Sequence, residues 1–110
     1  MSSNVKERLF QGDDRETLER ALDTWGNDAQ ELHGVEELGE LLTALMQYRR
    51  GRIDKPEVRD EIADVLIVAN QFAILYGSDG VENQIEYKMA RLNTRLDRYV
   101  DADTEREVEQ

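Results

Sequence analysis

Four acidic side chains fall into two pairs with the spacing of neighbours on a helix. Glu37 and Glu40 are three residues apart, and so are Glu61 and Asp64. Residues at this spacing project from the same helix face. Carboxylate pairs on two helices can hold one or more divalent cations, and all-oxygen coordination suits Mg²⁺ first and Mn²⁺ next.

The apolar residues that continue each pair predict that the acids face inward. Glu61 shares a helical stripe with Val65 and Val68, and Glu37 shares one with Leu41. Converging carboxylates repel one another and are costly to desolvate unless a positive charge lies among them. Arginine side chains or a divalent metal would supply that charge, and the pattern favours a metal over solvated acids. A carboxylate-bridged di-iron site uses Glu-x-x-His pairs, which are absent here.

A row of cations borders the last apolar stripe of the chain. Lys88, Arg91 and Arg95 flank Met89 and Leu92. Such a row commonly does no more than border an amphipathic helix, but in an acidic protein it also suits the phosphates of a metal-bound substrate. The sequence contains neither GxxxxGK[ST] nor GxGxxG, so that metal and side chains would have to hold any phosphate.

Four helices are predicted to position these side chains. Their predicted ranges are 13–25, 27–50, 56–76 and 81–99. Glycines follow the first three ranges, Pro56 suits the first turn of the third, and a turn is predicted at 78–80. No strand candidate survives, because the apolar run within 56–76 lacks turn residues. Short connections between four helices predict an all-α antiparallel four-helix bundle.

The domain organisation predicted from this pattern is simple. We expect an N-terminal extension at 1–12, one helical domain at 13–99 and an acidic flexible tail at 100–110. The segment 62–76 is apolar around nearly its whole circumference, whereas a surface helix would keep a polar face. This segment predicts an interface between two copies of the chain.

Composition excludes several classes of protein. The 110 residues contain no cysteine and only one histidine, His33, which excludes disulfide scaffolds, zinc fingers and thiol nucleophiles. The net charge of −11 disfavours nucleic-acid and anionic-membrane surfaces. No apolar run has the length of a signal peptide or a transmembrane helix, which predicts a cytoplasmic protein.

The acidic motif resembles that of a known superfamily. Glu36-Glu37-x-x-Glu40, 20 intervening residues and Glu61-x-x-Asp64 resemble the signature of the MazG-like all-α nucleoside triphosphate pyrophosphohydrolases. Dimeric dUTPases and phosphoribosyl-ATP pyrophosphohydrolases belong to the same superfamily. The resemblance covers about residues 15–98, including the run VEELGELLTAL and the basic residues near the C-terminus.

The resemblance implies a dimer, or a dimer of dimers, that hydrolyses a nucleoside triphosphate to the monophosphate and pyrophosphate using Mg²⁺, with Mn²⁺ as a substitute. Clearing aberrant nucleotides from the pool is one role for such an activity. The implied residues are Glu37, Glu40, Glu61 and Asp64 as metal ligands, Glu36 and Glu37 as the catalytic acids, Lys88, Arg91 and Arg95 at the phosphates, and Trp25 and Gln30 at the nucleobase. Glu36 would act as an outer-shell group or as a base that orients water, and Trp25 equally suits a core position.

Two other functions remain open. The acids suit phosphoribosyl-ATP pyrophosphohydrolase as well, because its substrate is also a nucleoside triphosphate derivative. A non-catalytic helical module that binds a partner through its apolar third helix would account for that helix but would have no need of four inward acids.

Overall fold

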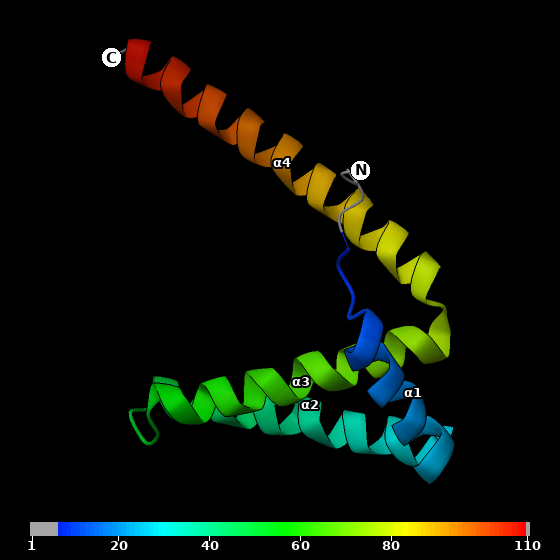
Figure 1. The fold of residues 1–110 in the computed structure, drawn as a ribbon. Helices are drawn as coiled ribbons and strands as arrows, with labels where there is room; N and C mark the ends of the chain where they lie inside the picture. Colours follow the sequence, from blue (N-terminus) through cyan, green and yellow to red (C-terminus); the bar gives the residue numbers. More distant parts are fainter. Residues whose placement is uncertain (1–6, 110) are drawn as a thin grey trace. The chain divides into compact units, whose positions relative to one another are not determined.

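The computed structural model describes residues 7–109. Its helices are α1 (Gly12–Trp25), α2 (Asn27–Arg49), α3 (Lys55–Tyr76) and α4 (Ser78–Glu109) (Figure 1). The described residues contain no strand, so the all-α prediction is confirmed. Within the same range, no helix combines the length and apolarity that crossing a membrane requires.

Glycines directly follow α1 and α3, where the sequence predicts that these helices end. Gly26 follows α1 with φ 93°, and its N–H donates to the Leu22 carbonyl at 2.9 Å. Gly77 ends α3 in the same way, with φ 109° and a bond to the Ala73 carbonyl. These positive φ angles are readily adopted only by glycine, which is why the helices stop there. Pro56 lies in the first turn of α3, where its missing N–H costs nothing.

The fourth helix is longer than predicted at both ends. The residues expected to form a turn, 78–80, are its first turn, and the helix continues through the segment expected to be a flexible tail as far as Glu109. After Gly80 the chain has no glycine or proline to stop a helix. Local pairs accompany the extension, such as Arg106 with Asp103 at 3.5 Å.

The core of the protein lies among the first three helices. α2 and α3 run side by side in opposite directions, and α1 packs against both (Figure 1). The contacts divide the chain into one compact unit that ends at Ser78 and a second that begins at Asp79 and contains the rest of α4. The side chains that are most buried and apolar are Leu18 and Leu22 of α1, Ala44 of α2, and Val68 and Ala73 of α3.

Candidate metal centre

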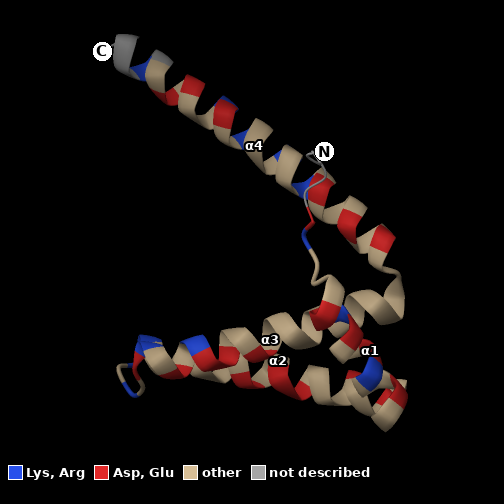
Figure 2. Cartoon of the chain, in the orientation of Figure 1, with Lys and Arg blue, Asp and Glu red and all other residues tan. Residues whose placement is uncertain are grey.

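The antiparallel pair α2–α3 brings three carboxylates together. Glu37 of α2 and Glu61 and Asp64 of α3 each offer one oxygen, and these oxygens all lie within 4.8 Å of one another. Figure 2 shows acidic segments on both helices along the stretch where they lie side by side. The three residues are among the four predicted metal ligands, and they come from both predicted pairs.

Two oxygens of this cluster have no partner in the structure. Glu37 Oε2 and Glu61 Oε2 are buried and accept no hydrogen bond, and the whole Glu37 side chain is only 14% exposed. A buried carboxylate oxygen without a donor loses its hydration and gains nothing in return. Such oxygens are suitable ligands for a hard divalent cation, which prefers oxygen donors. The three carboxylates could therefore hold a metal ion.

The electrostatics of the cluster show the same lack of positive charge. Burial raises the pKa of Glu37. The charge of Glu40 and its hydrogen bond to Glu37 raise this pKa further, as does the charge of Asp64, while His33 lowers it. Burial likewise raises the pKa of Glu61, with Glu40, Asp64 and Asp60 adding to the effect. Both carboxyl groups are thus harder to ionise than usual, as expected for acids that converge without a cation.

The remaining predicted ligand lies at the edge of the cluster. Glu40 is exposed and is not one of the three converging residues, but it is close enough for its charge to raise the pKa of both Glu37 and Glu61. Glu36, the predicted outer-shell group or base, is also exposed. It lines a groove of about 600 Å³ between α2 and α3, together with Glu40, Thr43, Gln47 and Glu61.

The His33 imidazole contacts the cluster directly. Its Nε2 lies 3.5 Å from Glu37 Oε1, one turn away on α2. The side chain is 51% exposed, which leaves the imidazole in contact with water. This arrangement agrees with a partly exposed histidine that caps Glu37 rather than a buried metal ligand.

The two predicted nucleobase residues have different surroundings. Trp25 is 66% exposed at the end of α1, so it does not join Leu18 and Leu22 in the core. Gln30 accepts a hydrogen bond at its Oε1 from Nε2 of Gln71, which is 4% exposed, at 3.1 Å. The structure therefore gives Gln30 a role in joining α2 to α3, which the sequence did not indicate.

The predicted phosphate-binding residues all lie on α4. Lys88, Arg91 and Arg95 are exposed and belong to the second compact unit, whereas the carboxylates belong to the first. On their own helix these three cations neighbour Met89 and Leu92, which are each 43% exposed.

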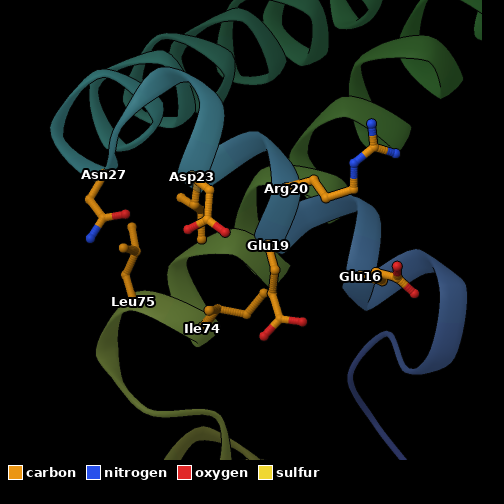
Figure 3. A pocket seen from close by; sticks show the side chains of 8 residues that line it. Glu16, Glu19, Arg20, Asp23, Asn27, Ile74 and Leu75 are labelled. Atoms are coloured by element: carbon orange, nitrogen blue, oxygen red, sulfur yellow. The ribbon is translucent and has the colours of Figure 1, made fainter.

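A second hollow lies between α1 and the C-terminal part of α3. It has a volume of about 550 Å³, and Figure 3 shows Glu19 beside Ile74 and Asn27 beside Leu75. Its rim is acidic through Glu16, Glu19 and Asp23, and Glu19 also pairs with Arg15 at 3.6 Å. None of the predicted site residues lines it.

A close contact that the sequence analysis missed joins the two helices of the site. A Cβ atom on Gly34 would lie 2.5 Å from Cζ of Phe72, so the phenyl ring occupies the place of a side chain on α2. Glycine within a helix costs about 1 kcal/mol relative to alanine. Gly34 inside a long helical pattern was therefore a signal for close approach.

No protein-family model matches the chain, and neither the curated proteins nor the solved structures searched contain a match.

Proposed function

We propose that the protein hydrolyses a nucleoside triphosphate to the monophosphate and pyrophosphate with the help of Mg²⁺ held by Glu37, Glu61 and Asp64. The observation that carries this proposal is the convergence of three carboxylates within 4.8 Å, two of which have a buried oxygen without a partner. The resemblance of the acidic motif to the MazG-like superfamily supports the choice of reaction.

Each group of the chain has a defined part in this proposal. The three carboxylates hold the cation, and Glu40 completes the acidic set from the edge. A bound Mg²⁺ supplies charge neutralisation at the triphosphate and an activated water. In this proposal Lys88, Arg91 and Arg95 would contact the remaining phosphate charge. Glu36, which lines the same groove as Glu61, would act as an outer-shell group or as a base that orients water. Trp25, which is exposed, and Gln30 contact the base.

The direct test is pyrophosphate release from the eight canonical ribo- and deoxynucleoside triphosphates, with Mg²⁺ and with EDTA. We expect release that depends on the metal, with an equal amount of monophosphate. Asp64→Asn should lower the rate by about 10²-fold or more, as loss of one preorganised electrostatic contact does. Asp97→Asn, which removes an exposed acidic charge on α4, is the matched control. A folded Asp64→Asn protein with the activity of the control would refute the site.

Two other functions are distinguished by the same assay. Phosphoribosyl-ATP, assayed beside the ordinary nucleotides, tests the sister activity, which the carboxylates suit equally well. A non-catalytic interaction module would release no pyrophosphate from any of these compounds. The module is favoured by one observation, the large exposed apolar side chains of the first unit, among them Leu42 at 65% and Leu66 at 52%.

We infer that these exposed apolar side chains form the interface of a homodimer, within which the helices complete an antiparallel bundle. On α3, Val68 and Ala73 are buried, but Ile62, Leu66 and Ile67 are each more than 40% exposed. Ile62 and Leu66 are one turn apart on the same face of α3, and exposed apolar patches mark interaction surfaces. A second copy of the chain is the proposed partner, and a dimer of two such dimers is the larger assembly that the resemblance allows.

A further inference from the structure

The hydrogen bond between Gln30 and Gln71 has the same α2–α3 alignment as the carboxylates. Gln71 Nε2 donates to Gln30 Oε1 at 3.1 Å. Glu37 follows Gln30 by seven residues along α2, and Asp64 precedes Gln71 by seven residues along α3. Because the helices are antiparallel and seven residues make about two turns, the same alignment that joins the two amides places Glu37 opposite Asp64.

Gly34 lies between the amide contact and the acids. It is four residues after Gln30 and three before Glu37. The Phe72 ring packs directly on it, since an added Cβ would be 2.5 Å from Cζ and 2.8 Å from Cε1 of the ring. Real Cβ contacts do not approach so closely, so a methyl group at this position must displace the ring or move the helices apart.

A change in the distance between α2 and α3 at Gly34 also changes the distances between the carboxylates. Glu37 is less than one turn away, about 4.5 Å along the helix axis. Divalent cations of the Mg²⁺ type require their oxygen ligands at nearly fixed distances of about 2.0–2.1 Å. A shift of a few tenths of an ångström between the two helices should therefore weaken metal binding at a site whose ligands come from both helices.

We propose that Gly34 is a positioning residue, which lets Phe72 close the α2–α3 pair so that Glu37 meets Glu61 and Asp64 at metal-binding distance. This inference rests on the proposed metal site. Neither residue touches the metal or the substrate, and their effect is carried by the register of the two helices.

The test compares two glycine substitutions in the same helix. Gly34→Ala adds a methyl group against the ring, whereas Gly39→Ala adds one with no atom within 4 Å. The measurement is Mn²⁺ binding to the full-length protein, followed by electron paramagnetic resonance of the free ion, with Mg²⁺ as competitor. We expect Gly34→Ala to weaken binding tenfold or more and Gly39→Ala to leave it unchanged.

Two further variants separate positioning from stability. Leu22→Ala removes a buried side chain of α1, which lies outside the α2–α3 pair, and lowers global stability. The Mn²⁺ affinity of its folded state should stay that of the wild type. Phe72→Leu removes the ring atoms that meet the added Cβ. In the Gly34→Ala/Phe72→Leu double variant we expect the affinity to recover to that of Phe72→Leu alone.

The outcomes separate this inference from the proposed function. If the wild type and Gly34→Ala bind Mn²⁺ equally, or if the double variant shows no recovery, the positioning role is wrong and the metal site stands. If the wild type itself binds neither Mn²⁺ nor Mg²⁺, the metal site is wrong and the positioning role falls with it. Should Gly34→Ala not fold, Gln71→Met tests the same register by removing the bond to Gln30, and wild-type affinity in that variant would overturn the inference.

Discussion

Replacing Glu37 by glutamine should change the stability of the protein in opposite directions with and without metal. The substitution keeps the size and polarity of a side chain that is only 14% exposed, but it removes one negative charge from the cluster. In the metal-free protein that charge repels Asp64, whose nearest ligand oxygen lies within 4.8 Å. In the metal-bound protein the same charge holds the cation.

The expected magnitudes follow from these distances. Two unit charges 4.8 Å apart repel by about 0.9 kcal/mol at the dielectric constant of water and about 3.5 kcal/mol at an effective value of 20. Glu37→Gln should therefore stabilise the metal-free protein by about 1–3 kcal/mol. With Mg²⁺ at 100 times its dissociation constant, binding stabilises the wild type by about 2.7 kcal/mol. A 10- to 100-fold loss of affinity would reduce that gain to about 0.4–1.4 kcal/mol.

Thermal melts followed by circular dichroism at 222 nm, at pH 8 with EDTA or with Mg²⁺, measure both effects. The lost metal stabilisation of about 1.3–2.3 kcal/mol corresponds to a Mg²⁺-induced rise in Tm that is about 5–18 °C smaller than in the wild type. Asp97→Asn, which removes an exposed acidic charge on α4, controls for the general loss of charge and should keep the metal response. The reasoning is refuted if Glu37→Gln melts lower than the wild type in EDTA, or if its response to Mg²⁺ equals that of the control.

Four other predictions can be checked separately. Because the pKa values of Glu37 and Glu61 are raised above 4.5, the folded metal-free protein binds more protons than the unfolded chain above that pH. Urea titrations in EDTA should therefore show that these groups make the free energy of unfolding fall as pH rises from about 4.5, and the fall should be weaker in Glu37→Gln. An equal fall in the wild type and Glu37→Gln would show that the cluster is misassigned. The Tyr76 hydroxyl donates a hydrogen bond to the Glu31 carboxylate, and this bond and the charge of Glu31 raise the pKa of Tyr76 above 10.0. Absorbance at 295 nm should therefore show a late tyrosine ionisation that Glu31→Gln abolishes. Leu22→Ala should lower the free energy of unfolding by about 2–5 kcal/mol in urea melts, and a loss below about 0.5 kcal/mol would contradict its place in the core. Sedimentation velocity should give a dimer for the wild type and a monomer for Leu66→Lys, with exposed Thr94→Lys as control, whereas a monomeric wild type would refute the dimer.

The features that the sequence predicted well are those that a few residue types decide locally. Gly26 and Gly77 end helices because they take positive φ angles, and Pro56 begins one because it lacks an N–H. The inward direction of Glu37 and Glu61 also followed from periodicity, since each acid continues an apolar stripe and each has a buried oxygen.

The features that the sequence did not predict depend on contacts between helices or on the absence of a residue that stops a helix. α4 runs to Glu109 although its apolar stripe ends at Tyr99, because no glycine or proline follows Gly80 to stop the helix. Trp25 has the spacing of a core residue but is 66% exposed, whereas Leu22 in the same last turn of α1 is buried. The partners of Gln30 and Gly34 lie on another helix, and spacing within one helix cannot identify them.

The position of the acids relative to the packing contacts explains how the fold can carry them. Ionised and without metal, the cluster opposes the approach of α2 to α3. The bond between Gln30 and Gln71 and the contact of Phe72 with Gly34 lie within two turns of the acids and favour that approach. A site opposed by its own charges is preorganised only if neighbouring contacts hold the helices together before the cation binds. The same argument predicts where the pair is weakest, at the carboxylates, and why a metal ion bound there would stabilise the whole three-helix unit.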